Sequence, residues 1–152
     1  MSPNPQTPIT LMLIEDNPID VKLLSYALEQ DSKRPVELIV ASDGEEAISW
    51  MQAQAADPAA RKLDFVVLDL NLPKRDGTEV LQVIRSMKEL QGVPVAVLSS
   101  SPTDVIQDRL TQAGVKADGH FEKPMDIDGL FVLAKELRGW FEKARAAASG
   151  SR

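Results

Sequence analysis

The 152-residue chain contains no cysteine and only one histidine. Disulfide bonds, thiolate metal sites and multi-histidine metal sites are therefore excluded, so any metal would be held by oxygen, which favours Mg²⁺, Ca²⁺ or Mn²⁺. No apolar run approaches the roughly 18 residues that span a bilayer, and the start "MSPNPQTPIT" lacks the basic and apolar segments of a signal peptide. These absences predict a cytoplasmic protein with no membrane partner.

Basic residues are fewer than acidic residues in this chain. The chain has 17 Lys and Arg residues against 23 Asp and Glu residues, a net charge of -6. This balance argues against nucleic acid as the main partner, because phosphate backbones are bound by basic surfaces. With 43% hydrophobic and 26% charged residues, the composition is that of a soluble globular protein, and the length fits one domain.

Short apolar runs alternate five times with longer segments of helical periodicity. Strands are predicted at residues 9–14, 36–42, 65–70, 93–101 and 117–124. Helices are predicted at residues 18–30, 45–56, 78–90, 102–113 and 126–147. Residues 9–147 should form the domain, and residues 1–8 and 148–152 are predicted to be disordered tails.

The central strands read as continuous apolar runs, which is typical of strands that are buried on both faces. Together with the alternation, this predicts a doubly wound α/β fold, a five-stranded parallel sheet with helices on both faces. Ligands of such folds bind at the carboxyl ends of the strands.

Polar side chains gather at this predicted edge. Five of the six residues from Phe65 to Leu70 are apolar, and the exception, Asp69, should be costly to bury without a partner. Clustered carboxylates would favour Mg²⁺, the backbone carbonyl of Asn71 could reach that metal, and a lysine could neutralise a phosphoryl group. Asp69 is thus the candidate nucleophile toward phosphorus. The residues at the strand ends are Glu15, Asp16, Asp69, Asn71, Ser99 and Lys123.

Each residue alone has a structural explanation. An acidic pair after a strand often caps the next helix, a strand-end Asp can accept bonds from nearby N–H groups, and a lysine before proline usually lies at the surface. Their joint occurrence at four strand ends favours a phosphoryl-transfer site.

Residues 9 to about 141 resemble the receiver domain of two-component response regulators. The motifs that carry the resemblance are "IEDNP", "LDLNLPKRDG", "VLSSS" and "EKP". The resemblance implies the flavodoxin-like strand order 2-1-3-4-5. It also implies that Glu15 and Asp16 help to hold Mg²⁺, that Asp69 accepts phosphate from a sensor histidine kinase, and that Ser99 and Lys123 are the switch hydroxyl and the invariant lysine.

One position departs from the family pattern. The switch aromatic lies three residues before the lysine, where Tyr or Phe is usual, and this chain has His120. His120 is either a half-exposed strand residue with an ordinary pKa or a pH-sensing element of the switch. The resemblance also implies a cis peptide bond between Lys123 and Pro124, which would help to aim the lysine.

The layout is similar to single-domain regulators that partner phytochrome-type kinases. "IEDNPIDVKLL", "MQAQAADPAARKLD" and "DLNLPKRDG" carry this likeness, which implies a bacteriophytochrome as the kinase. Only "ASGSR" follows the last helix, so the signal is expected to leave by protein contacts without a DNA-binding output domain.

The last predicted helix has one apolar stripe and three large side chains outside it. We expect a homodimer through the face of the fourth and fifth helices, as the subgroup resemblance implies. The side chains outside the stripe either anchor that interface or simply flank the core. The stripe is Leu130, Leu133, Ala134, Leu137 and Phe141, and the outliers are Ile127, Phe131 and Trp140.

Three other functions fit the sequence less well. A phosphatase of the haloacid dehalogenase type needs a second aspartate where this chain has Asn71. A transcription factor needs a DNA-reading element. A pseudo-receiver, a binding or dimerisation module that cannot be phosphorylated, would lack one of the site residues. We therefore expect a phosphoacceptor and not an enzyme, with at most slow self-catalysed phosphorylation and dephosphorylation.

Overall fold

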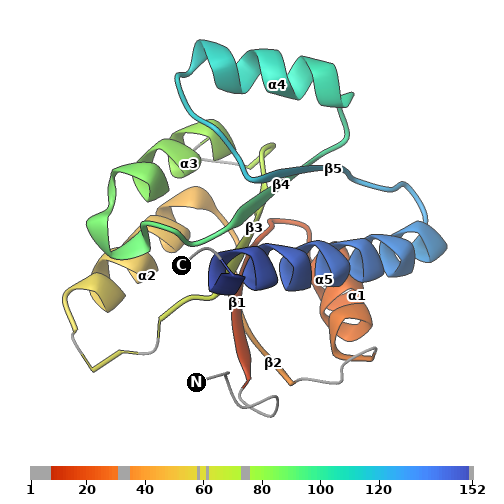
Figure 1. Cartoon of the computed structure of the whole chain (residues 1–152). Helices are drawn as coiled ribbons and strands as arrows, with labels where there is room; N and C mark the ends of the chain where they lie inside the picture. Colours follow the sequence, from red (N-terminus) through yellow and green to blue (C-terminus); the bar gives the residue numbers. More distant parts are fainter. Residues whose placement is uncertain (1–7, 31–34, 58, 61, 73–75, 151–152) are drawn as a thin grey trace.

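The structure is a computed structural model that describes residues 8–30, 35–57, 59–60, 62–72 and 76–150. Strands and helices alternate along the described chain (Figure 1). The strands are β1 (Ile9–Ile14), β2 (Val36–Ala41), β3 (Phe65–Asp69), β4 (Val95–Ser99) and β5 (Gly119–Glu122). The helices are α1 (Pro18–Gln30), α2 (Gly44–Ala55), α3 (Gly77–Ser86), the 3₁₀ turn η1 (Lys88–Leu90), α4 (Thr103–Gln112) and α5 (Ile127–Gly150).

The five strands form one sheet in the order β2-β1-β3-β4-β5, and every neighbouring pair is parallel. The predicted fold class and strand order are therefore confirmed. Apolar side chains of α1 and α5 cover one face of the sheet, and those of α2, α3 and α4 cover the other. Such double coverage is what a parallel sheet requires.

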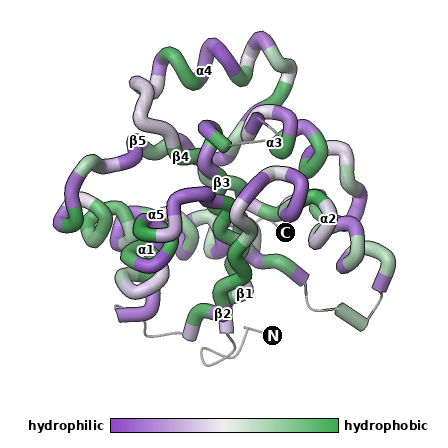
Figure 2. The backbone as a smooth tube through the Cα atoms, turned by 180° about the vertical axis from the view of Figure 1, so that it is seen from behind, coloured by the Kyte–Doolittle hydropathy of each residue, from purple (hydrophilic) through white to green (hydrophobic). Residues whose placement is uncertain are grey.

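Successive residues of each central strand point into different halves of the core. In β1, Leu11 and Leu13 join the cluster on the side of α1 and α5, while Met12 and Ile14 join the opposite cluster. Both sets are buried, so the strand reads as an unbroken apolar run. In Figure 2 the strands accordingly form a hydrophobic centre between helices of mixed character.

Helix α5 packs on the sheet through the predicted stripe. All five residues of this stripe are buried. Outside the stripe, Trp140 packs edge-on against Phe65 and Phe121, and Phe131 packs edge-on against Tyr26. These two aromatics therefore flank the core, the second of the two interpretations. Ile127 is the outlier that remains open to solvent, at 56% exposure.

Some element boundaries differ from those predicted. The helix expected at 78–90 ends at Ser86, whose hydroxyl donates to the carbonyl of Val83, and Met87 then adopts an extended backbone before η1. The last helix, expected to end near Ala147, continues to Gly150. Residues 1–7 and 151–152 of the predicted tails lie outside the described part of the chain. No helix within the described residues has the length and apolarity to cross a membrane.

Candidate functional site

The carboxyl ends of the central strands bring the predicted residues together. Asp69 is the last residue of β3, the middle strand of the sheet, and Glu15 directly follows the neighbouring β1. Ser99 ends β4 on the other side of β3. All three residues are buried, with exposed fractions of 3% or less. Burial of two carboxylates at this depth requires a compensating charge.

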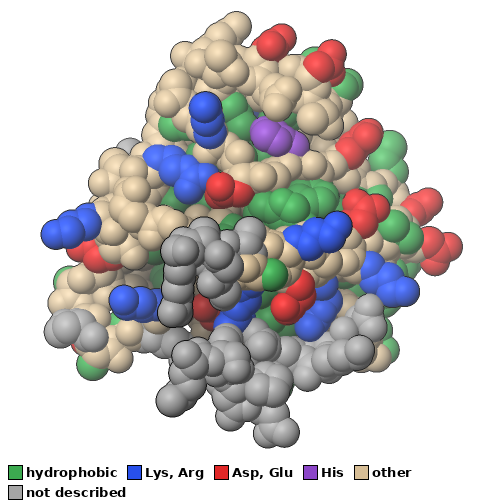
Figure 3. Space-filling model, viewed as in Figure 1, with side chains coloured by type: hydrophobic (Ala, Val, Ile, Leu, Met, Phe, Trp, Pro, Cys, Tyr) green, Lys and Arg blue, Asp and Glu red, His purple; other side chains and the backbone are tan. Residues whose placement is uncertain are grey.

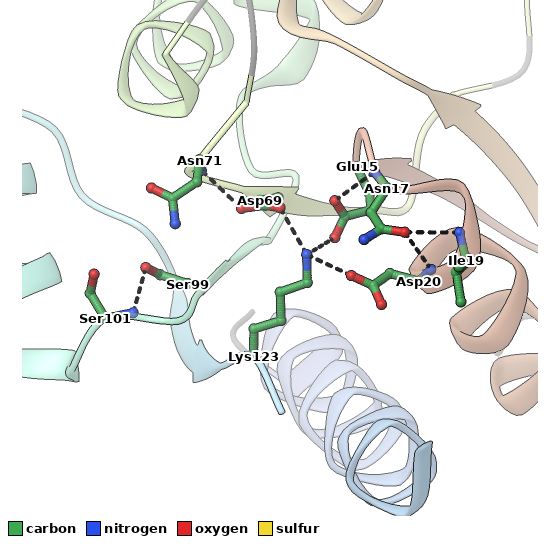
Figure 4. A network of polar contacts seen from close by, with 9 residues as sticks. All are labelled: Glu15, Asn17, Ile19, Asp20, Asp69, Asn71, Ser99, Ser101 and Lys123. Atoms are coloured by element: carbon green, nitrogen blue, oxygen red, sulfur yellow. Dashed lines mark hydrogen bonds and ion pairs between the residues drawn. The ribbon is translucent and has the colours of Figure 1, made fainter. Parts of the chain in front are cut away.

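Lys123 provides that charge (Figure 4). Its Nζ lies 3.1 Å from Oδ2 of Asp69, 2.5 Å from Oε1 of Glu15 and 2.9 Å from Oδ2 of Asp20. Its backbone N–H donates to the carbonyl of Ser99 at 2.8 Å, which fixes the chain just beyond β5. One ammonium therefore joins carboxylates from β3, the β1–α1 connection and α1.

The expected cis peptide bond before Pro124 is wrong. The bond is trans, as all described peptide bonds are. The lysine reaches all three carboxylates from this backbone, so its placement does not require the less stable isomer.

The carboxylate of Asp69 is held in a defined orientation. Its Oδ1 accepts the backbone N–H of Asn71 at 2.8 Å, and its Oδ2 faces Lys123. A hydrogen bond to one oxygen and an ion pair to the other satisfy a buried carboxylate. The role of the Asn71 carbonyl as a metal ligand stays a prediction.

Three carboxylates form a candidate metal centre. Glu15, Asp16 and Asp69 each place one oxygen within 4.8 Å of the others, with Asp16 exposed and the other two buried. This all-oxygen donor set fits a hard divalent cation such as Mg²⁺, which takes few protein carboxylates and keeps several waters. The exposed Asp16 leaves one side of the centre open to solvent.

The electrostatics of the site reflect an excess of negative charge. Burial, reinforced by the nearby Asp69 carboxylate, raises the pKa of Glu15 to about 7 even though Lys123 opposes the shift. Burial alone would lower the pKa of Lys123, but its contacts with Glu15 and Asp20 outweigh burial and raise it. The two shifts therefore differ in origin: burial dominates at Glu15, whereas the neighbouring carboxylates dominate at Lys123.

The two predicted switch residues, Ser99 of β4 and His120 of β5, line the same small cavity. The Ser99 hydroxyl accepts the backbone N–H of Ser101 at 3.1 Å. His120 is half-buried in β5, opposite Val97 of β4. Ser99, Ile106 of α4 and His120 line one small cavity between these elements. The coupling of Ser99 to His120 stays a prediction, and the cavity that both residues line is the space between them.

Asp20 is the one site residue that the sequence analysis missed. It lies in the first turn of α1, where an acidic residue is common because it favours the positive end of the helix dipole. The sequence did contain a signal. Asp20 lies four residues after Asp16, in the first turn of the helix predicted at residues 18–30, and therefore close to the predicted site.

Comparison with known proteins agrees with this geometry. A family model described as the response regulator receiver domain matches residues 11–135. The response regulator Rcp1 of Synechocystis sp. is 29% identical over 150 residues, which cover 98% of this chain and 100% of Rcp1.

Solved structures of similar proteins share the fold at 30% identity or more. The phosphorylated cyanobacterial phytochrome response regulator RcpA has a TM-score of 0.76 at 32% identity, covering 89% of this chain and 94% of RcpA. The Mn²⁺-bound form of Rcp1 has a TM-score of 0.74 at 30% identity, covering 89% of this chain and 96% of Rcp1. The bacteriophytochrome response regulator AtBRR has a TM-score of 0.64 at 33% identity, covering 86% of this chain and 91% of AtBRR.

Proposed function

Because the chain belongs to the response regulator receiver domain family, we propose that it accepts a phosphoryl group on Asp69 from a sensor histidine kinase. The observation that carries the proposal is the environment of Asp69. A buried carboxylate at the centre of the sheet edge has one oxygen fixed by a backbone N–H and the other beside the Lys123 ammonium. The carboxylate is thus oriented for attack and its product charge has a partner.

In the proposed reaction, Oδ2 of Asp69 forms a bond to phosphorus while the bond from phosphorus to the donor's histidine nitrogen breaks. The electron pair of that bond returns to the imidazole nitrogen of the kinase. The Asn71 N–H keeps the carboxylate from rotating, since it holds Oδ1 at 2.8 Å. Lys123 stabilises the phosphoryl oxygens as charge accumulates on them.

The carboxylates of Glu15, Asp16 and Asp69 would hold Mg²⁺, and the carbonyl of Asn71 is proposed as a further ligand. When bound, the cation neutralises charge on the transferred phosphoryl group. Binding of Mn²⁺ by the related Rcp1 supports a divalent cation at this position.

Phosphorylation would be reported through Ser99 and His120. An aspartyl phosphate carries about two negative charges, and its oxygens attract the Ser99 hydroxyl away from the Ser101 N–H. His120 can then enter the cavity that both residues line, and the surface formed by α4, β5 and α5 changes. The signal is proposed to pass by altered protein contacts.

Two partners are proposed. A phytochrome-type kinase, such as a bacteriophytochrome, is supported by likeness to RcpA and AtBRR, which are described as phytochrome and bacteriophytochrome response regulators. A second copy of this chain is the other partner, through the face of α4, β5 and α5. Figure 3 views this face, where the histidine lies near a hydrophobic patch among acidic and basic side chains. Val105 of α4 and Ile127 of α5 are exposed apolar residues suited to this interface.

Incubation with acetyl phosphate tests the central proposal. We expect Mg²⁺-dependent, base-labile labelling of the wild type, no labelling of Asp69→Asn, and normal labelling of the control Asp104→Asn in the first turn of α4. Absence of labelling in a protein that still binds Mg²⁺ would overturn the proposal and favour the pseudo-receiver, a binding or dimerisation module that cannot be phosphorylated.

A further inference from the structure

Asp20 differs from the other two carboxylates that contact Lys123. Glu15 and Asp69 belong to the acidic cluster suited to a cation, and Asp20 does not. Asp20 instead approaches Lys123 from the first turn of α1, with 2.9 Å between its Oδ2 and the ammonium nitrogen. The lysine is therefore shared between the candidate metal centre and one carboxylate outside it.

This arrangement bears on a competition at the site. A divalent cation and the Lys123 ammonium both need Glu15 and Asp69, and two positive charges a few ångströms apart repel each other. Without a further partner, Lys123 would either weaken cation binding or be driven away from Asp69. A carboxylate that the cation does not use removes this conflict.

We propose that Asp20 is a positioning residue, which holds the Lys123 ammonium beside Asp69 while a divalent cation occupies the carboxylates of Glu15, Asp16 and Asp69. The proposal rests on the function proposed above, because it assumes that cation and lysine serve Asp69 together. Asp20 acts through Lys123 and touches neither the cation nor the phosphoryl group.

Local structure fixes Asp20 for this role. Asn17 precedes α1, and its side-chain oxygen accepts the backbone N–H groups of Ile19 at 2.9 Å and Asp20 at 3.3 Å. This cap sets where the helix begins and hence where the Asp20 side chain points. That side chain is only 23% exposed, so water screens its ion pair less than it would at an open surface.

The alternative is that Asp20 only stabilises the first turn of α1. A carboxylate in the first turn interacts with the helix dipole without any lysine. Under this alternative, removal of the charge would act on the helix alone, and the presence of Lys123 would not alter the result. The alternatives are therefore separated by asking whether the effect of Asp20 depends on Lys123.

Calorimetric titration of the full chain with MgCl₂ makes this test without any phosphodonor. Asp20→Asn and Asp20→Glu are compared in the wild type and in a Lys123→Met background, with Asp104→Asn as a control that removes a first-turn carboxylate from α4. Thermal melts establish that each variant is folded. We expect Asp20→Asn to weaken Mg²⁺ binding about fivefold when Lys123 is present, as for other coupled charged residues in contact.

In the Lys123→Met background the same substitution should change the affinity less than about twofold, because screened charges without a contact couple weakly. Asp20→Glu should restore most of the wild-type affinity, since its carboxylate can still reach the ammonium. An equal loss in both backgrounds, or a loss no larger than that of Asp104→Asn, would overturn the positioning role.

The phosphorylation experiment adds a second readout. Asp20→Asn should raise the Mg²⁺ concentration that half-saturates labelling more than it lowers the plateau. If wild-type labelling never occurs, the proposed phosphoacceptor function fails. The calorimetric comparison still decides whether Asp20 acts through Lys123, so the two failures are distinguishable.

Discussion

Arg109 of α4 lies 2.5 Å, from Nη2 to Oδ1, from Asp76, the residue that caps the start of α3. The same Asp76 oxygen accepts the backbone N–H of Thr78 at 2.9 Å. Burial by itself would raise the pKa of Asp76, but the bonds from Arg109 and Thr78 outweigh it and hold the pKa below its usual 3.8. One carboxylate thus caps α3 and ties it to α4.

A pH dependence of stability follows from this pair. Because the pKa of Asp76 is lowered in the folded protein, its contribution is complete above pH 3.8 and is lost as the pH falls through the folded value. Asp76→Asn keeps a capping oxygen and removes the charge. It should lower the free energy of unfolding by about 0.5 kcal/mol at pH 7, since both side chains are partly exposed, and by less at pH 3.

Urea denaturation at the two pH values measures this difference. Asp76→Ala serves as the companion variant, because it also removes the cap and should cost about 1 kcal/mol more at both pH values. A penalty of Asp76→Asn that is equally large at pH 3 would show that charge is not its cause.

Ionisation of Glu15 should have the opposite effect on stability from ionisation of Asp76, in protein freed of metal with EDTA. The pKa of Glu15 is raised from 4.5 to about 7 by burial and by Asp69, so ionising Glu15 costs stability as the pH rises from about 4.5 through 7. Glu15→Gln should therefore be more stable than the wild type at pH 8, by about 1 to 3 kcal/mol, and no more stable at pH 4. Thermal melts at both pH values provide the measurement.

Mg²⁺ should reverse this order at pH 8. A cation that binds the folded wild type stabilises it by mass action, and the variant lacks one of the carboxylates. If Mg²⁺ raised the melting temperature of the wild type no more than that of Glu15→Gln, Glu15 would not be part of the metal centre.

Gly77 should be indispensable to the position of Asp69. A Cβ at this residue would lie 2.5 Å from the Leu70 Cα and 2.7 Å from the Asp69 carbonyl oxygen, and both are backbone atoms that cannot rotate away. We expect Gly77→Ala to lower the free energy of unfolding by about 1 to 3 kcal/mol and to slow labelling of Asp69. Urea denaturation and acetyl phosphate labelling measure the two effects.

Gly139→Ala is the matched control for this substitution. Gly139 lies within α5, and a Cβ there has no neighbour within 4 Å. Alanine should stabilise the helix by about 0.5 to 1 kcal/mol and leave labelling unchanged. If Gly77→Ala resembled this control, the close approach of the two backbones could not be a constraint on the site.

The proposed homodimer is tested by sedimentation at tens of micromolar, with and without acetyl phosphate. We expect a dimer that Ile127→Arg converts to a monomer, because a charge would replace an exposed apolar side chain at the start of α5. Val40→Arg is the control, since Val40 lies in β2, at the opposite edge of the sheet from β5. A wild-type monomer in both phosphorylation states would contradict the proposal.

Local sequence determined most of the fold and much of the site. Apolar runs such as residues 9–14 and 65–70 predicted buried parallel strands, because only strands covered on both faces keep alternate side chains equally apolar. The placement of Asp69 and Lys123 at one sheet edge followed from parallel strand direction alone. The inward stripe of α5 followed from helical periodicity.

Tertiary structure decided what depends on distances between segments far apart in the chain. The contact between Asp20 and Lys123 and the bridge from Asp76 to Arg109 join residues on different elements, whose separation depends on how each helix crosses the sheet. Packing also placed Trp140 against Phe65, although helical periodicity left it outside the stripe. Periodicity gives the direction of a side chain from its own helix, but only the packed neighbours determine whether that direction ends in solvent or in the core.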